Sequence, residues 1–271
     1  PVFAHATVFN KQAMNPQQIP DLIEEAIRTA YSKKGPAVVI LPTDMVDFEI
    51  EYKPRKEKRY IPQMQKPVIN KDDMDAVVEM IKESENPVLY LGQGVYNAKD
   101  VVSKVSNKFK MPIVTSVLGI GVAVESDHKN FMGSFGRLGF KSAYDALYNA
   151  DLVLFVGANM PFARYWPKQL KVVQVNNEIS DIGKQLEVDI GIVADSKDFL
   201  NQLLDYDYTV ERRKFLDAGR LSKKYWDQWL DDLANDESHG LSGEAVIKEV
   251  SKLSTRDAIF ALDVGNNTMH S

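Results

Sequence analysis

The chain has 271 residues, of which 44% are hydrophobic and 26% charged, an ordinary composition for a globular protein of one large domain or about two smaller ones. Its formal net charge of −5 gives no support to nucleic-acid binding, and without cysteine it can form no disulfide, thiolate metal site or thiol nucleophile. No apolar run approaches the roughly 20 residues that span a bilayer, and the lack of cysteine fits a cytoplasmic protein.

The first segment predicts half of a parallel α/β unit. Apolar residues recur at spacings of three and four through residues 17–34 (QQIPDLIEEAIRTAYSKK), which is typical of an amphipathic helix. Gly35 and Pro36 end the helix, and residues 37–42 (AVVILP) form a continuous apolar run of the length of a buried strand. Because the chain begins with Pro1 and has no signal peptide, we expect a piece of a longer protein.

Residues 49–67 (EIEYKPRKEKRYIPQMQKP) separate this unit from the rest of the chain. They are rich in charge and proline and have no apolar period, which is typical of a linker between domains, and we assign residues 53–65 to it. The basic run from Lys53 to Arg59 is also compatible with an anion-binding patch, but a solvated linker is the favoured interpretation.

From Lys71 onward, helical patterns alternate with short apolar runs of strand length. Predicted helices lie at residues 72–84, 98–109, 140–149 and 198–204, and predicted strands at residues 87–92, 112–116, 151–157, 171–176 and 189–195. Such alternation indicates an α/β fold, with a parallel sheet covered by helices on both faces. We expect this domain to span residues 66–206.

Residues 208–235 predict a mostly polar connecting helix, because aromatic and aliphatic side chains keep a helical stripe without a sustained heptad. Another helix is predicted at residues 243–253, followed by a buried strand at residues 258–262 and a polar loop at residues 263–268. In open α/β sheets, ligands bind at loops that leave the carboxyl ends of strands. Because this second unit is not completed, we expect the carboxyl end also to be that of a fragment.

Four loops at the predicted carboxyl ends of strands carry the candidates for ligand binding. Gly92 and Gly94 precede a helix, where backbone N–H groups can approach a phosphate, although a GxG alone also fits a simple turn. Arg137 can clamp a diphosphate, although a surface salt bridge is the favoured interpretation of this arginine taken alone. The other candidates in these loops are Thr115, Ser116, Ser134, Asn159, Pro161 and Phe162. Together the loops predict a site that holds a cofactor.

No hydrolytic or metal-binding motif is recognisable in the sequence. The four histidines are widely separated without HxxxH spacing, and neither a GxSxG elbow nor a GxxxxGK[ST] loop occurs. Asn176, Asn177 and Glu178 can hold a ribose or a metal, but turn residues after a strand explain them about as well. The pattern therefore indicates a cofactor holder whose reacting groups lie elsewhere.

The order of these motifs resembles the thiamin-diphosphate-dependent pyruvate oxidases, relatives of acetolactate synthase and pyruvate decarboxylase, over nearly the whole chain. The most specific segment is ADLVLFVGANMPFA, residues 150–163. The resemblance implies that residues 1–52 end a pyrimidine-binding domain, residues 66–206 form an FAD-binding middle domain with a Rossmann-like parallel sheet, residues 207–240 are a connecting helix, and residues 241–271 begin a diphosphate-binding domain.

In the oxidases the middle domain binds FAD, so the resemblance implies that the same loops bind FAD here. The implied contacts are Gly92, Gly94, Thr115, Ser116, Ser134, Arg137, Asn159, Pro161, Phe162 and Asp195, with Asn176 as a candidate for the ribose. Residues 175–178 (VNNE) depart from the acidic D-x-D-P stretch that family members commonly carry, which weakens the expectation for the adenosine contacts. Asp263, Gly265 and Asn266 resemble the first loop of a thiamin diphosphate site.

The resemblance also implies that parts of the enzyme are missing. The glutamate that activates thiamin would lie upstream, and the GDG…NN signature for Mg²⁺ and the diphosphate would lie downstream, since no GDG occurs here. We therefore expect a fragment, inactive by itself, of an FAD-dependent pyruvate oxidase that is a homo-oligomer (tetramer or dimer) when complete. The alternatives are an acetolactate-synthase-type carboligase with structural FAD, and a non-catalytic nucleotide-binding or assembly domain.

Overall fold

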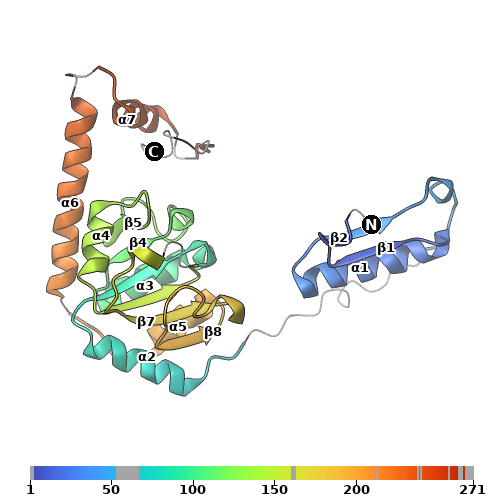
Figure 1. Ribbon diagram of the computed structural model, residues 1–271, viewed down its shortest axis with the longest axis horizontal. Coiled ribbons are helices and arrows are strands. Elements are labelled where there is room, and N and C mark those ends of the chain that lie inside the picture. Colours follow the sequence, from blue (N-terminus) through green and yellow to red (C-terminus); the bar gives the residue numbers. More distant parts are fainter. Residues whose placement is uncertain are drawn as a thin grey trace. The chain divides into compact units, whose positions relative to one another are not determined.

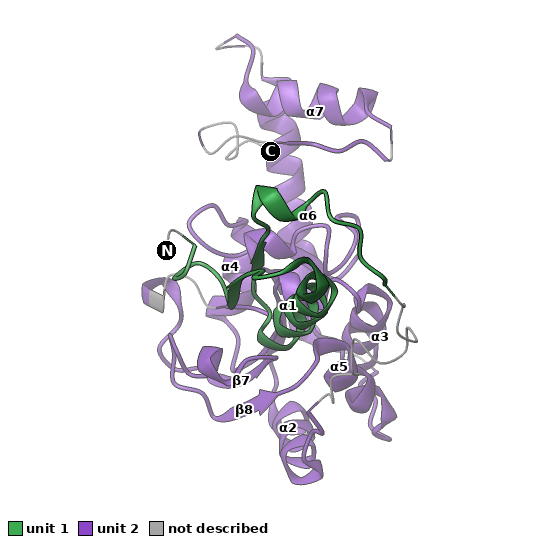
Figure 2. Ribbon diagram, turned by 90° about the vertical axis from the view of Figure 1, so that its right-hand side faces the viewer, with its two compact units in different colours: residues 1–66 green, residues 67–271 purple. Residues whose placement is uncertain are grey.

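The chain folds into two compact units, residues 1–66 and 67–271 (Figure 2). The computed structural model describes residues 3–52, 67–159, 163–211, 213–236, 238, 240–255, 257–261 and 265. The predicted linker, residues 53–65, lies outside these described ranges.

The smaller unit consists of one helix packed on two parallel strands. β1 (Phe9–Gln12) pairs in parallel with β2 (Ala37–Ile40), and α1 (Ile19–Lys33) connects them. The helix ends at Lys34, which adopts a left-handed conformation with φ of 50°. The predicted helix and the predicted strand at residues 37–42 are confirmed, whereas β1 is too short and polar to be recognised from its sequence.

The larger unit is built on a six-stranded parallel sheet with the strand order β5-β4-β3-β6-β7-β8 (Figure 1). The strands are β3 (Pro87–Leu91), β4 (Ile113–Thr115), β5 (Phe131–Ser134), β6 (Leu152–Val156), β7 (Lys171–Asn176) and β8 (Ile190–Val193). The chain runs outward from β3 to β5, returns to the other side of β3, and runs outward again from β6 to β8. The strand order therefore reverses between β3 and β6, which is the arrangement of dinucleotide-binding α/β folds.

Helices cover both faces of this sheet, which explains why its strands are continuous apolar runs. α2 (Lys71–Glu83), α3 (Lys99–Phe109) and α5 (Ser196–Asp205) pack on one face, and α4 (Lys141–Tyr148) and α6 (Lys214–Asn235) pack on the other. Along β3, Leu89 and Leu91 enter the first core, whereas Val88 and Tyr90 enter the second. The α/β class and the parallel sheet with helices on both faces are confirmed.

Short 3₁₀ helices occupy several of the connections. They are Pro16–Gln18, Thr43–Met45, Gln93–Val95, Val117–Gly119, Ala163–Tyr165 and Ile179–Asp181. α7 (Gly243–Leu253) follows α6 and contacts it. None of the helices in the described ranges combines the length and apolarity that crossing a membrane requires.

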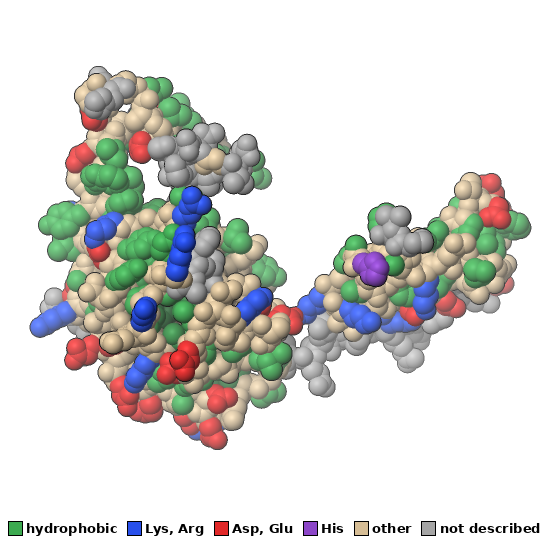
Figure 3. All heavy atoms as spheres, viewed as in Figure 1, with side chains coloured by type: hydrophobic (Ala, Val, Ile, Leu, Met, Phe, Trp, Pro, Cys, Tyr) green, Lys and Arg blue, Asp and Glu red, His purple; other side chains and the backbone are tan. Residues whose placement is uncertain are grey.

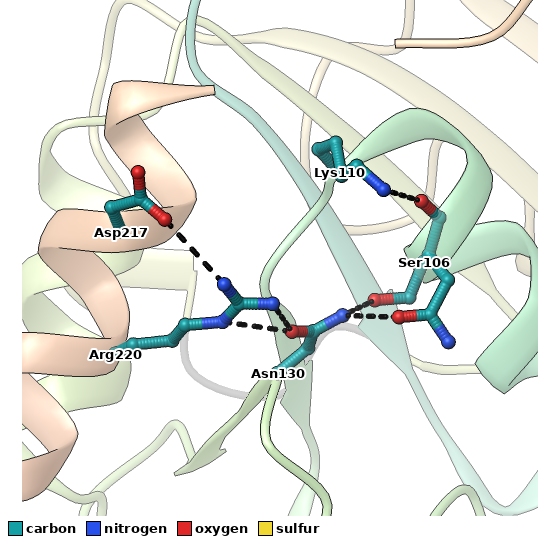
Figure 4. Close-up of polar contacts among 6 residues, drawn as sticks. Ser106, Lys110, Asn130, Asp217 and Arg220 are labelled. Carbon is teal, nitrogen blue, oxygen red and sulfur yellow. Dashed lines mark hydrogen bonds and ion pairs between the residues drawn. The ribbon is translucent and has the colours of Figure 1, made fainter. Parts of the chain in front are cut away.

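The amino-terminal half of α6 is fixed to the sheet by a polar network around Asn130 (Figure 4). The buried Asn130 side chain accepts hydrogen bonds from Arg220 Nε (3.1 Å) and Nη2 (2.6 Å), and it donates to Ser106 Oγ (2.9 Å) and Asn107 Oδ1 (3.2 Å). The same segment of α6 approaches the sheet closely, because a Cβ on Gly219 would lie 3.0 Å from Met132 Sδ. Further along α6, side chains such as Tyr225 and Trp229 stay exposed, and hydrophobic side chains gather over this helix in Figure 3.

Two of the predicted elements differ from the structure. The predicted strand at residues 258–262 is wrong for its described part, since residues 258–261 form no strand and Ile259 is 96% exposed. A strand needs a neighbouring backbone to pair with, and no described strand of the chain lies beside this segment. The predicted helix at residues 208–235 begins only at Lys214, because Arg213 is extended and its guanidinium donates to carbonyls at the ends of α2 and α3.

Candidate functional site

A cavity of about 620 Å³ lies at the carboxyl ends of the strands of the larger unit. Its lining residues are Gly92, Gln93, Gly94, Ser116, Val117, Leu118, Phe135, Gly136, Arg137, Leu138, Gly157, Ala158, Asn159, Asn176, Asn177 and Asp181. They come from the loops that follow β3, β4, β5, β6 and β7, so the cavity extends across the point between β3 and β6 where the strand order reverses. Ligands bind at this position in open α/β sheets.

The middle of the cavity is a close crossing of two glycine-containing loops. Gly94 N–H donates to Gly157 O at 2.9 Å, and a Cβ on Gly94 would lie 2.7 Å from Gly157 Cα. A Cβ on Gly92 would lie 2.3 Å from Gly157 O. Real Cβ atoms do not approach backbone this closely, so these positions require glycine.

Backbone donors at this crossing are free to meet a ligand. Within the described ranges, the N–H groups of Gln93 and Ala158 donate to no protein acceptor, and both residues line the cavity. Unsatisfied N–H groups in a glycine-containing loop beside a short helix are suited to phosphate oxygens.

The end of the cavity that is formed by the loops after β4 and β5 is largely apolar. Val117, Leu118 and Leu138 are 48%, 69% and 40% exposed, and Phe135 is nearly buried beside them. Arg137 is exposed at this end and has no ion-pair partner in the part of the chain that the structure describes, so the salt-bridge interpretation is not supported there. An apolar wall with one cation suits a flat ring system attached to an anionic group.

Phe135 is held by an aromatic cluster behind the cavity. Its ring lies 4.7 Å from that of Trp166 and 4.6 Å from that of Tyr144, measured between centroids. Tyr90 packs against Trp166 at 5.1 Å, and its burial raises the pKa of its hydroxyl, which stays neutral. The cluster therefore gives the apolar end a rigid, uncharged support.

The end of the cavity that is formed by the tip of β7 and the loop after it is polar. Asn176 Nδ2 donates to Asn159 Oδ1 at 3.3 Å, and Asn176 Oδ1 accepts from the N–H of Asn177 at 2.8 Å. Asp181 also lines this end, and its side chain is 22% exposed. Amide and carboxylate groups of this kind suit hydroxyl and amine donors of a ligand.

The structure brings together part of the predicted site. Gly92, Gly94, Ser116, Arg137, Asn159 and Asn176 line the cavity. Thr115 and Ser134 are buried at strand ends outside the lining, and Asp195 accepts hydrogen bonds from Lys197 N and Asp198 N at the start of α5. Pro161, Phe162, Asp263 and Asn266 lie outside the described residues, and Gly265 is described only as an exposed bend.

Several lining residues could not be named from the sequence, among them Val117, Leu118, Leu138 and Asp181. The first three are apolar residues in polar, glycine-containing loops after strands, which is a usable sign of a ligand wall. Asp181 carries no such sign, because its place depends on how the loop after β7 folds back. No group of three or more possible metal ligands occurs among the residues that the structure describes.

Comparison with known proteins agrees with this geometry. Residues 74–203, which contain the sheet and the cavity, match the family model of the thiamine pyrophosphate enzyme central domain. This part of the chain belongs to the thiamine pyrophosphate enzyme family.

Similar proteins extend the match to nearly the whole chain. The putative thiamine pyrophosphate-containing protein YdaP of Bacillus subtilis is 30% identical over 99% of this chain and 46% of its own length. A pyruvate oxidase of Lactiplantibacillus plantarum is 29% identical over 100% of this chain and 45% of its own length. An acetolactate synthase large subunit of Corynebacterium glutamicum is 27% identical over 97% of this chain and 44% of its own length. The chain spans about half the length of these curated relatives.

Proposed function

We propose that the cavity of this thiamine pyrophosphate enzyme binds FAD. The observation that carries the proposal is the extent of the cavity. It reaches across the carboxyl ends of five neighbouring strands, from β5 to β7, and the crossing of the two glycine-containing loops lies at its centre. Four spacings of about 4.8 Å between adjacent strands give a length of about 19 Å. This length suits a dinucleotide, with its diphosphate at the reversal point of the sheet.

The residues present fit the three chemical parts of FAD. The N–H groups of Gln93 and Ala158, with Arg137, are available to the diphosphate. The wall around Phe135 is suited to the isoalloxazine ring, and the amides of Asn159 and Asn176 to a ribose. When bound, FAD supplies an electron acceptor, and the protein contributes its orientation and the exclusion of water.

For the complete protein, we propose a pyruvate oxidase that uses thiamin diphosphate, Mg²⁺ and FAD to convert pyruvate to acetyl phosphate or acetate. The similarity to the L. plantarum pyruvate oxidase over the full chain supports this proposal. The candidate thiamin contacts Asp263 and Asn266 lie outside the described residues, so no step is assigned to them. We further propose a cytoplasmic homo-oligomer, as the family resemblance implies.

An acetolactate-synthase-type carboligase is the second candidate, because several acetolactate synthase large subunits are 25–27% identical over most of the chain. FAD would then have a structural role. A non-catalytic nucleotide-binding domain is the third candidate, and the similarity to enzymes over nearly the whole chain makes it the weakest of the three.

Product analysis of the complete protein separates these candidates. With pyruvate, thiamin diphosphate, Mg²⁺ and FAD, the proposal predicts acetyl phosphate or acetate together with reduction of an added electron acceptor. Acetolactate as the main product, without acceptor reduction, would assign the protein to the carboligases. No consumption of pyruvate would favour the non-catalytic domain.

A further inference from the structure

The two ends of the cavity differ in charge, and this difference orients a ligand along it. Among the described lining residues, Arg137 is the one cation and Asp181 the one carboxylate, and they belong to loops that follow β5 and β7, at opposite ends of the five strands. A phosphate beside Asp181 would be repelled, whereas a hydroxyl donor there would be attracted.

The amide oxygens of Asn176 and Asn159 are each already engaged in a hydrogen bond within the protein. The N–H of Asn177 can only donate, so the oxygen of the Asn176 amide must face it. The nitrogen of Asn176 then faces Asn159 Oδ1. Each of the two amide oxygens thus already accepts one hydrogen bond, so a ligand hydroxyl at this end is best met by an acceptor from another residue.

Asp181 offers that acceptor on a loop that is held in place. Gln174, which is 2% exposed in β7, donates through Nε2 to Asp181 O at 2.9 Å and accepts at Oε1 from Gly183 N at 2.8 Å. One buried amide thus closes both ends of the turn that carries Asp181. Satisfied buried hydrogen bonds of this kind fix a backbone strongly, because losing one leaves a buried polar group unpaired.

Two further contacts restrain the same turn. Ile182 lies directly over Gly191 of β8, where a Cβ would come within 2.5 Å of Ile182 Cγ2. Gly183 has a φ of 71°, which lets the chain reverse directly after Ile182. The carboxylate itself has a loose partner, since Lys184 Nζ lies 3.6 Å from Asp181 Oδ1 and is largely exposed.

We propose that Asp181 binds the ribose hydroxyls of the adenosine half of the cofactor, and that Gln174 is the positioning residue that holds it there. The proposal rests on the FAD site proposed above. The two neighbouring hydroxyls of a ribose can both donate hydrogen bonds to one carboxylate. Acidic residues recognise ribose in this way in dinucleotide-binding folds. The acceptor here comes from the turn after β7, whereas the strand tip itself carries Asn176.

The test compares Asp181→Asn with the native 271-residue chain by titrating three ligands: FAD, ADP, which carries the adenosine half, and FMN, which lacks it. We expect about tenfold weaker binding of FAD and ADP, because a charge-assisted acceptor becomes a neutral one, and unchanged binding of FMN. Asp205→Asn, at the exposed end of α5 outside the cavity, is the matched control and should bind all three as the native chain does.

The possible outcomes separate this inference from the FAD proposal. If the native chain binds FAD and Asp181→Asn binds it equally well, or loses FMN to the same extent, Asp181 is not the ribose contact, and FAD binding stands. If the native chain binds none of the three ligands, both proposals fail together. Equal melting temperatures of the two chains exclude loss of folding as the cause.

Gln174→Met tests the positioning role, because it keeps the length of the side chain and removes both hydrogen bonds. We expect FAD and ADP to bind several-fold more weakly, and the double variant with Asp181→Asn to bind no more weakly than Asp181→Asn alone. Fully additive losses would show that Gln174 acts on the cavity by another route and would overturn this part of the proposal.

Discussion

Arg137 is the residue through which the cavity can most directly recognise a diphosphate. It is exposed among the lining residues and has no ion-pair partner in the described part of the chain. Arg137→Ala should weaken FAD binding by about 1.5–3 kcal/mol, because a hydrogen bond to a charged group is lost. Isothermal titration measures this, with Lys224→Ala on α6 as a charge-matched control. An unchanged affinity would remove Arg137 from the site.

Gly94 is predicted to be intolerant of any side chain. A methyl group there would lie 2.7 Å from Gly157 Cα, and neither backbone can yield without opening the crossing. Gly94→Ala should lower the free energy of unfolding by roughly 1–3 kcal/mol and also weaken FAD binding. Urea denaturation with a parallel titration checks both effects.

At the scale of elements, α5 depends on a cap that the sequence analysis interpreted as a cofactor contact. Asp195 Oδ1 accepts from the N–H groups of Lys197 and Asp198 at 3.0 and 3.1 Å. Asp195→Ala should therefore cost about 1 kcal/mol of stability and leave FAD affinity unchanged, whereas Asp195→Asn should retain most of the stability. A loss of affinity larger than the loss of stability would instead support the implied contact with FAD.

The junction of α2 and α5 should make stability depend on alkaline pH. The pKa of Tyr206 is raised from 10.0 to about 12, mainly by burial and secondly by the 2.5 Å hydrogen bond that its hydroxyl donates to Asp75. Because the folded pKa is raised, the neutral hydroxyl stabilises the fold fully below pH 10, and this contribution is lost as the pH rises from 10 to about 12. Denaturation at several pH values should show this decline, and Tyr206→Phe should flatten it. An equally steep decline in the variant would assign it to other groups.

At the scale of the whole molecule, the elements of the larger unit follow from local pattern, and their arrangement does not. Continuous apolar runs such as residues 87–91 and 152–156 identify buried strands, because both of their faces are covered. Nothing in those runs says that β6 returns to lie beside β3, since strand order is set by packing between distant segments. The failed strand at residues 258–262 has the same cause, because an apolar run forms a strand only where a partner strand exists.

The candidate site divides in the same way between local and non-local information. The glycines at 92 and 94 could be predicted because two glycines between a strand and a helix mark a tight turn where backbone can approach a ligand. Asp181 could not, because its position depends on the amide of Gln174, seven residues earlier, and on the glycine at 191 in the next strand. Conversely, Thr115 is a polar residue at a strand tip, as predicted, but lies buried outside the cavity lining.

The measurement that tests the FAD site most directly is a titration of the 271-residue chain with FAD, in which binding is monitored by fluorescence quenching and by thermal melting. We predict saturable quenching and, at a flavin concentration of about 100 times the dissociation constant, a melting temperature higher by about 5–10 °C, which corresponds to about 2.7 kcal/mol of added folding stability. Neither quenching nor a melting shift at flavin concentrations far above that of the chain would contradict an FAD site carried by residues 67–271.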